Sequence, residues 1–420
     1  MADLRTRLRG WFARDEPHEI PSISPNRAGP LTPEAFGDAH NDFAIAMYGR
    51  LRGRRGNLCF SPFSLRTALG MVYAGARGET ATEMRAALRI PADADETFHR
   101  TSGDVLRHLN REKDEHGGTI VASSVWSQDG ADLEPAFTKI MAEWYRSEVH
   151  LLNFRGKDDT ARERINQWAS DITRHRVQHL IPPGALKIPV ALVLANAVYF
   201  KGSWSMPFRR AATRDEPFLL PAGSAVTVPM MQQRTEVAHV QARGYQAVEL
   251  SYRDGGLTML VVLPDREDGL TDLEGKLSVR MLHDCVAGMT YRTVDLFLPR
   301  FEIRPDTMEL SAPIAALGMP LAFDPVRADF SGINGRRPPD ERAVFVSAIL
   351  QKTFVEVNER GTEAAAATAL AVQPMAGRSR PKPPKIPIFR ADHPFLFGIR
   401  DRTSGALLFL GRLADPGHID

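Results

Sequence analysis

Cysteine is nearly absent from this chain, since its 420 residues contain only Cys59 and Cys285. Two cysteines do not make a disulfide framework, so the fold has to depend on an apolar core. Hydrophobic residues make up 43% of the sequence and charged residues 25%, which is typical of a globular protein with a sizeable core. Cys59 lies in an apolar run and Cys285 near a helical segment, so we expect both to be buried free thiols.

Long apolar runs are missing as well. The longest, such as residues 257–263, are far too short to cross a membrane, so we expect no membrane span. The chain also lacks a large charge of either sign. Its net charge of +2 gives no reason to expect nucleic acid as a partner.

The N-terminal segment has no apolar core and does not resemble a secretory signal. Leu4, Leu8 and Trp11 share one helical face, which leaves a weak membrane-surface helix as an alternative. The favoured interpretation of residues 1–32 is a disordered tail. If Met1 is the true start, we expect a cytoplasmic protein; the sequence does not otherwise indicate a compartment.

Enzyme motifs are absent too. The sequence has no Gly-x-Ser-x-Gly nucleophile elbow, no His-Glu-x-x-His and no paired Cys-x-x-Cys. His175 and His179 are four residues apart and could share a helix face, but the sequence Pro182-Pro183-Gly184 soon after them indicates a fraying helix end. We therefore expect no catalytic site, no metal and no cofactor.

The segments that are present predict the fold class. Residues 191–201 and 257–263 are almost wholly apolar and strand-like, whereas residues 39–51 carry a helical stripe. Long strands mixed with grouped helices, rather than regular strand–helix repeats, predict an α+β fold. No internal repeat or second-domain boundary is visible, so residues 33–416 are expected to form a single domain.

One stretch organises the functional interpretation: residues 356–376, EVNERGTEAAAATALAVQPMA. Read with a period of two, the side chains alternate between an uncharged face and a face that carries Glu363, a pattern that suits a half-buried strand. The uncharged, largely small face consists of Thr362, Ala364, Ala366, Thr368, Leu370 and Val372. Alanine is also the best helix former and Thr362 could cap a helix, so composition alone favours a helix. The segment could also be exposed in one state and a strand in another.

Six stretches, in order along residues 33–416, together resemble the serpin family of serine protease inhibitors. They are NLCFSPFSLRTALGMVYAGARGET, ANAVYFKGSWSMPF, LPRFEI, LGMPLAF with ADFSGI, KTFVEVNERGTEAAAATA, and FRADHPFLFGIRDRTSGALLFLGRL. The resemblance implies three β-sheets, eight or nine helices and an exposed reactive loop at about residues 359–388. It also implies a monomer, and an extracellular location is typical of the family.

The resemblance gives residues 356–376 a mechanism. A target protease would cleave the loop and remain attached as an acyl-enzyme, while residues 361–373 insert as a new central strand. The residues that match the family hinge are Glu359, Gly361, Thr362, Glu363, Ala364, Ala365, Ala366, Ala367 and Thr368. The inner face of this hinge has no charged residue and no proline, which indicates a working inhibitor acting as a suicide substrate.

Family spacing from Glu359 places the scissile bond at Met375–Ala376. Methionine suits elastase-, chymotrypsin- or subtilisin-like pockets. The loop is longer than usual, and Arg378–Ser379 is the alternative bond, which would suit a trypsin-like enzyme. The expected partner is therefore a serine protease of one of these kinds.

A second set of residues matches the family's control regions. The residues that match the shutter are Ser61, Pro62, Ser64, Asn196 and Gln351. Gln351 stands where the family usually has histidine; it can hydrogen-bond but not titrate, so the polar cluster is expected to persist without pH-dependent opening. Trp204 matches the tryptophan of the breach, where the loop would insert, and Arg300 stands where lysine is frequent.

Two hypotheses remain besides inhibition. A non-inhibitory serpin could act as a binding or chaperone-like module. An enzyme on this scaffold has no residues to support it.

Overall fold

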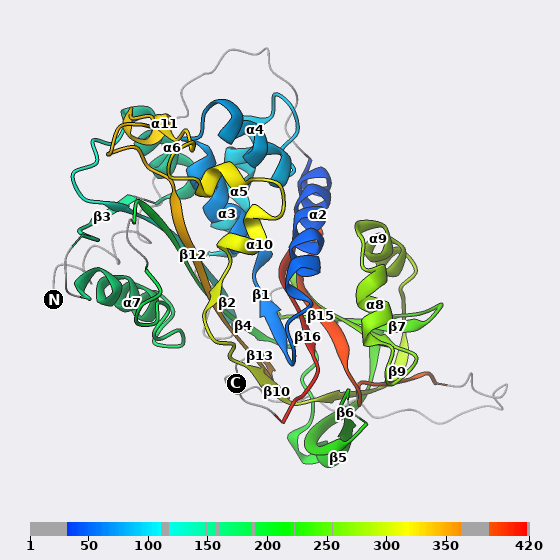
Figure 1. Ribbon diagram of the computed structural model, residues 1–420. Helices are drawn as coiled ribbons and strands as arrows, with labels where there is room; N and C mark the ends of the chain where they lie inside the picture. Colours follow the sequence, from blue (N-terminus) through cyan, green and yellow to red (C-terminus); the bar gives the residue numbers. More distant parts are fainter. Residues whose placement is uncertain are drawn as a thin grey trace, which may run out of the picture.

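The computed structural model shows two β-sheets packed with helices (Figure 1). The residues that it describes are 32–110, 117–147, 149–155, 159–186, 190–221, 223–253, 255–362 and 386–417. Among them, Cys59 and Cys285 are free and buried, as expected.

The seven-stranded sheet carries the features on which the function depends. Its strands follow the order β10 (Phe301–Ile303), β12 (Val346–Val357), β4 (Leu192–Ser203), β2 (Gly117–Gln128) and β3 (Val149–Leu152), with β11 (Met308–Glu309) beside β12 and β13 (Gly361–Thr362) beside β4. The apolar run predicted as a central strand is β4, which is buried along nearly its whole length. Strands β4 and β12 run parallel and pair directly in the middle of the sheet.

The nine-stranded sheet holds most of the C-terminal half of the chain. Its strands are β1 (Leu58–Phe60), β16 (Leu407–Leu413), β15 (Phe395–Asp401), β8 (Leu257–Pro264), β7 (Tyr245–Ser251), β6 (Ala225–Ala242), β9 (Thr290–Pro299) and β14 (Ile388–Arg390), with β5 (Arg214–Leu219) beside β6. Two of the three expected sheets share the 18-residue strand β6, so their hydrogen bonds form one continuous network.

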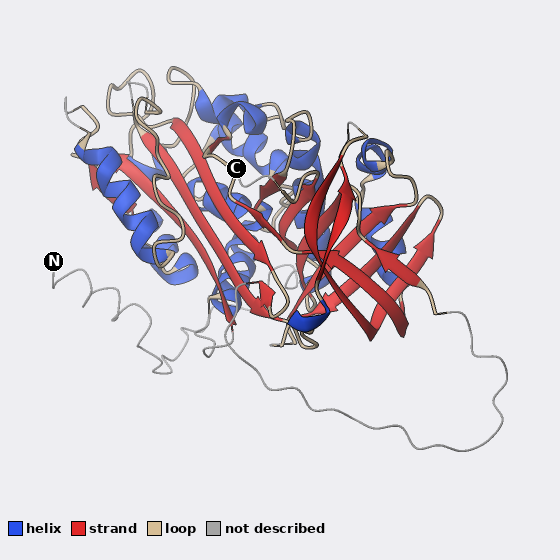
Figure 2. Cartoon of the chain, turned by 90° about the horizontal axis from the view of Figure 1, so that it is seen from below, coloured by secondary structure: helices blue, strands red, loops and turns tan. Residues whose placement is uncertain are grey.

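Ten α-helices lie in the described part of the chain, and two of them, α10 and α11, have only five and four residues. The helices are α2 (Pro33–Leu51), α3 (Pro62–Tyr73), α4 (Gly78–Ala87), α5 (Asp95–Leu109), α6 (Pro135–Tyr145), α7 (Thr160–Ile172), α8 (Leu270–Lys276), α9 (Val279–Ala287), α10 (Ser311–Ala315) and α11 (Ser331–Asn334). Helix α7 covers one face of the seven-stranded sheet and α3 to α6 lie on the other (Figures 1 and 2). The predicted α+β class is confirmed.

Helix α3 connects the two sheets. The Ser61 side chain caps it by accepting a hydrogen bond from the backbone N–H of Ser64, and Pro62 occupies the first turn, where proline costs nothing. All of its residues are buried, because it packs against β2 and β4 on one side and β16 on the other.

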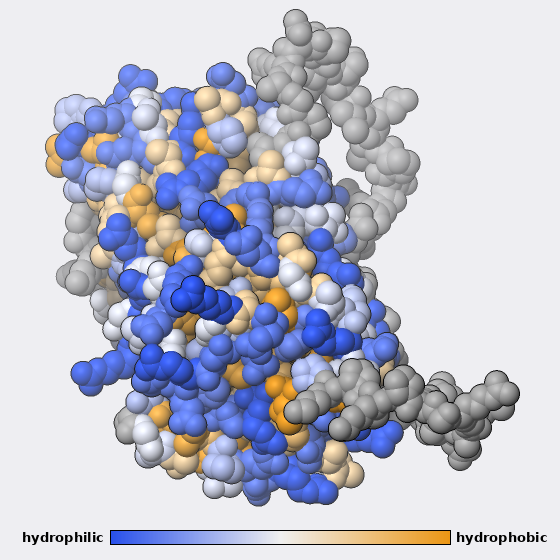
Figure 3. Space-filling model, turned by 90° about the vertical axis from the view of Figure 1, so that its right-hand side faces the viewer, coloured by the Kyte–Doolittle hydropathy of each residue, from blue (hydrophilic) through white to orange (hydrophobic). Residues whose placement is uncertain are grey.

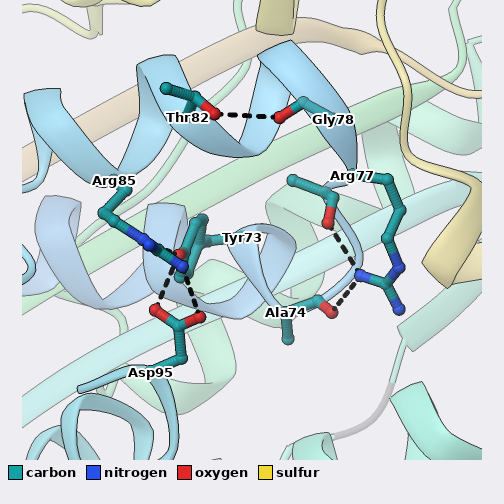
Figure 4. Close-up of polar contacts among 8 residues, drawn as sticks. Tyr73, Ala74, Arg77, Gly78, Thr82, Arg85 and Asp95 are labelled. Atoms are coloured by element: carbon teal, nitrogen blue, oxygen red, sulfur yellow. Dashed lines mark hydrogen bonds and ion pairs between the residues drawn. The ribbon is translucent and has the colours of Figure 1, made fainter. Parts of the chain in front are cut away.

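Polar contacts join α3 to its neighbours α4 and α5 (Figure 4). The Arg85 guanidinium donates to the Tyr73 hydroxyl at 3.0 Å and to Asp95 at 2.7 Å, and Tyr73 donates to the same carboxylate at 2.8 Å. Burial and the Asp95 carboxylate outweigh the opposing effect of Arg85 and raise the pKa of Tyr73 to about 12, so the phenol stays protonated as a donor.

Candidate functional site

The site begins at the seam between β4 and β12. The two strands pair from Leu192 and Val346 up to Tyr199 and Phe354. Side chains of β4 alternate between two apolar cores. One core, toward α3, contains Leu194, Val198 and Phe200, and the other, toward α7, contains Val193, Ala195 and Ala197.

Beyond the end of β12 the chain turns back on itself through Asn358–Gly361 and forms β13. There Gly361 pairs with Ser203 and Thr362 with Gly202, antiparallel to β4. The Thr362 side chain is fully buried, and its hydroxyl lies 2.9 Å from that of Tyr252. An antiparallel strand beside β4 has therefore already begun in the intact chain.

Gly361 cannot be replaced by a larger residue without disturbing this pairing. Its φ is +149°, and a Cβ atom there would lie 2.0 Å from the Gly202 carbonyl oxygen. Only glycine lets the two backbones approach this closely.

The start of the expected exposed loop needs correction. Glu359, Gly361 and Thr362 are buried, and only Arg360 among these turn residues is exposed. The physical reason is the turn, which returns the chain to the sheet and satisfies its backbone groups against β4.

Trp204 fixes this turn from the end of β4. Its indole N–H donates to the Asn358 carbonyl at 3.0 Å, and its backbone N–H donates to the Arg360 carbonyl at 2.9 Å. The ring is stacked on Tyr252 at 4.6 Å between centroids. Trp204 thus connects the turn to the residue whose hydroxyl contacts Thr362.

Glu359 anchors the same turn through its charge. Its carboxylate accepts hydrogen bonds from Arg300 at 2.5 Å and from the Thr213 hydroxyl at 2.8 Å. Burial by itself would raise the pKa of Glu359, but these two hydrogen bonds, together with a backbone hydrogen bond and the charge of Arg300, hold the pKa below its ordinary value of 4.5. Thr213 was not expected from the sequence, because its contact with Glu359 exists only in the folded chain.

Reversing the charge of Glu359 is expected to loosen the turn. In Glu359→Lys the lysine faces Arg300, and we expect a loss of roughly 1–3 kcal/mol in the free energy of unfolding, since the pair is only partly buried. Urea unfolding measures the loss. The double variant Glu359→Lys with Arg300→Glu restores an attractive pair, so it should recover most of the lost stability. Equal losses in the single and double variants would show that the ion pair does not stabilise the turn.

The ion pair between Glu359 and Arg300 also predicts that the stability of the fold depends on pH. Because the folded pKa of Glu359 is depressed, its contribution to stability is complete above the ordinary pKa of 4.5 and is lost as the pH falls through the folded value. Thermal unfolding of the wild type and Glu359→Gln should therefore differ at pH 6 and converge in acid, and a difference that does not shrink would contradict the assignment.

The shutter residues lie lower on the same seam. Gln351 of β12 accepts a hydrogen bond from the Ser61 N–H at 2.9 Å and donates to the Ser61 carbonyl at 3.0 Å. Ser61 in turn donates to the Leu408 carbonyl of β16 at 2.8 Å. Gln351 therefore connects β12 to the start of α3 through hydrogen bonds alone, and neither Gln351 nor Ser61 carries a titratable group.

The second half of the shutter belongs to β4. The Asn196 side-chain oxygen accepts hydrogen bonds from Ser64 at 2.8 Å and Ser123 at 3.0 Å. Asn196 is fully buried, and its side-chain N–H₂ has no hydrogen-bond partner among the described residues. Ser123 of β2 was not expected from the sequence, because its contact with Asn196 exists only in the folded chain.

Several expected residues lie outside the described part of the chain. These are the hinge residues Glu363, Ala364, Ala365, Ala366, Ala367 and Thr368, the bond Met375–Ala376 and the alternative bond Arg378–Ser379. Their roles remain predictions, as does the choice between helix and strand for the alanine-rich segment.

Within the described residues, no group of three or more His, Cys, Asp or Glu side chains is placed to hold a metal ion. Within that same part of the chain, no helix has the length and apolar character needed to cross a membrane.

The sheet, the shutter cluster and the turn at Trp204 together define one class of protein. The family model for serpins, serine protease inhibitors, matches residues 38–416. The chain belongs to the serpin family, and the prediction made from its motifs is confirmed.

Individual relatives support the same assignment. An uncharacterized serpin-like protein of Thermococcus kodakarensis is 37% identical over 90% of this chain and 85% of its own. Human leukocyte elastase inhibitor is 32% identical over 91% of this chain and all of its own. Among solved structures, human thyroxine-binding globulin has a TM-score of 0.81 at 26% identity, covering 92% of this chain and all of the other.

Proposed function

We propose that this protein inhibits a serine protease as a suicide substrate. The protease cleaves Met375–Ala376 and remains bound as an acyl-enzyme, while residues 361–373 insert between β4 and β12. The observation that carries the proposal is β13, whose two residues already pair with β4 and already bury Thr362. The relationship to leukocyte elastase inhibitor supports a protease of the elastase kind as partner.

The direction of β13 supports the proposed insertion. The seam is now a parallel pair, and a strand continuing from β13 runs antiparallel to both β4 and β12. Insertion thus replaces one parallel interface by two antiparallel ones, which are slightly more stable per residue. Thirteen inserted residues at roughly 3.3 Å each would move the attached protease on the order of 40 Å.

The register of β13 also predicts which residue would reach the shutter. Each step forward from Thr362, opposite Gly202, is one step back along β4. Six steps bring Thr368 opposite Asn196, on the same face as Thr362. The Thr368 hydroxyl would then offer an acceptor to the Asn196 N–H₂, which has none among the described residues.

Removing that hydroxyl should slow insertion. Thr368→Val keeps the shape and leaves the buried Asn196 donor unsatisfied, which costs about 1–3 kcal/mol in the inserted state. We expect a several-fold rise in the fraction of loop cleaved without complex formation, measured by titrating a protease with the inhibitor. Thr368→Ser keeps the hydroxyl and should behave as the wild type. If Thr368→Val is cleaved without complex formation no more often than the wild type, Thr368 does not lie opposite Asn196.

The proposed function is tested by incubation with elastase, chymotrypsin, subtilisin and trypsin. A complex that survives boiling in SDS is expected with at least one of them. Mass spectrometry of the released C-terminal peptide distinguishes a start at Ala376 from a start at Ser379. Cleavage without a complex would reject inhibition and leave the non-inhibitory binding module as the explanation of the fold.

A further inference from the structure

The segment that joins β14 to β15 is fastened to three other strands of the nine-stranded sheet. At its start, β14 pairs with β9, on the side of the molecule that carries α8 and α9 (Figure 1). After β14, the backbone N–H of Ala391 donates to the Phe297 carbonyl of β9 at 3.0 Å. The Asp392 carbonyl then accepts from the Leu219 N–H of β5 at 2.8 Å. The last of these contacts is the side chain of His393, which reaches the end of β8.

The His393 ring lies between two oxygen atoms that accept hydrogen bonds. Its Nδ1 atom is 2.9 Å from a carboxylate oxygen of Asp392, and its Nε2 atom is 2.9 Å from the Pro264 carbonyl oxygen. A neutral imidazole has one N–H and donates to only one of these oxygens, whereas the imidazolium ion has two and donates to both. The geometry therefore fits the protonated ring.

The local sequence and the packing hold the ring in this position. His393 precedes Pro394, and a residue before proline is biased toward extended backbone conformations. Only 7% of His393 is exposed, so water cannot readily replace a hydrogen bond that is lost there. Loss of one proton would leave a ring nitrogen lone pair facing an oxygen atom inside the protein.

Two carboxylates favour the protonated ring. Burial by itself lowers the pKa of His393, but the hydrogen bonds to Asp392 and Pro264, with the negative charges of Asp392 and Glu267, raise it above the ordinary value of 6.5. Glu267 lies in the exposed turn between β8 and α8, on the largely hydrophilic side of the molecule that Figure 3 shows.

Other ionisable groups on the neighbouring elements are paired or neutral. Arg390 of β14 forms a salt bridge with Glu216 of β5, and Arg266 in the turn after β8 pairs with Asp268. Burial raises the pKa of Tyr245, which lies opposite the end of β8, to about 12, so this phenol stays neutral. Among these groups, the ring of His393 is the one that changes charge near neutral pH.

We propose that His393 is a pH-dependent clamp, which fastens the junction of β14 and β15 to the end of β8 while its ring is protonated and releases the junction when the proton is lost. Because the pKa is higher in the folded state, the stability that the clamp contributes is complete below the ordinary value of 6.5 and is lost as the pH rises through the folded value. The expected reactive loop ends at β14, so the clamp sets how firmly that end is attached. The clamp does not rest on the proposed function.

The variant Asp392→Asn separates this clamp from an ordinary buried histidine. The asparagine N–H₂ can donate to Nδ1 of the neutral ring, whose own N–H still reaches the Pro264 carbonyl, so both contacts persist without the extra proton. Hydrogen exchange of residues 386–393, corrected for the intrinsic rate at each pH, measures how firmly the junction is held. Between pH 6 and pH 9 the wild type should lose protection by about threefold to tenfold, the effect of one hydrogen bond, and Asp392→Asn should not.

NMR of protein with labelled histidine gives a second measurement that does not depend on hydrogen exchange. The His393 signal, identified by its absence in His393→Gln, should titrate with a midpoint above 6.5 in the wild type and a lower one in Asp392→Asn. Asp132→Asn removes an exposed carboxylate between β2 and α6, so it is the matched control and should behave as the wild type. A wild-type midpoint at or below 6.5, or an equal change of protection in the wild type and Asp392→Asn, would overturn the clamp.

Discussion

Replacing Thr362 by arginine should convert the protein from an inhibitor into a substrate of its target protease. Thr362 is fully buried on the face of the seven-stranded sheet that contacts Tyr252, and insertion would keep it there. An unpaired charge at such a position costs several kcal/mol. The intact chain can escape this cost by releasing the two paired residues of β13 from β4, whereas the inserted strand has to bury the charge, so the cost falls on insertion. Since each 1.4 kcal/mol on a barrier is a factor of ten in rate, deacylation should overtake insertion.

Two observations would report the change in Thr362→Arg. The SDS-stable complex should disappear, and the number of inhibitor molecules consumed per protease should rise by at least about tenfold. Thr362→Ser keeps the hydroxyl next to Tyr252, and Arg360→Ala alters the exposed residue of the same turn; both should inhibit as the wild type does. Normal inhibition by Thr362→Arg would show that the buried face has been assigned wrongly.

Cleavage of the loop should raise thermal stability strongly. Inserting residues 363–373 between β4 and β12 adds about one backbone hydrogen bond per residue, each worth about 1 kcal/mol net, or on the order of 10 kcal/mol in total. At roughly 2 °C per kcal/mol, the midpoint of thermal unfolding should rise by about 20 °C or more. Calorimetry of the intact and cleaved protein measures this shift.

The control for this experiment is the cleaved Thr362→Arg variant. Its loop is cut at the same bond, but the charge opposes insertion, so its unfolding midpoint should stay close to that of the intact protein. A cleaved wild type without a gain in stability would mean that the seam does not accept a strand, whatever happens to the protease.

Much of the scaffold could be predicted from the sequence because it depends on local pattern. The apolar run at residues 191–201 specifies a buried strand, and Ser61 followed by Pro62 specifies the start of α3. The joining of two expected sheets into one through β6 could not be predicted in this way. The long β6 pairs with different neighbours at its two ends, and pairing between distant strands leaves no local signal in one sequence.

The site was predictable where a motif marks a residue and not where a partner comes from elsewhere in the chain. Glu359 and Asn196 were identified by their motifs, but Thr213 and Ser123, which hydrogen-bond them, were not. The alternation of small residues after Gly361 indicated a strand, but the return of the chain onto β4 depends on Gly202 and Trp204, which are far away in sequence. Such contacts are consequences of tertiary packing.

The claim at the centre of this account is that loop cleavage and strand insertion trap a protease covalently. Electrophoresis in SDS after incubation with elastase tests it most directly, with mass spectrometry of the released peptide on the same sample. We expect a boiling-resistant band that contains both proteins and a peptide beginning at Ala376. Complete cleavage of the loop with free, active elastase and no such band would contradict it.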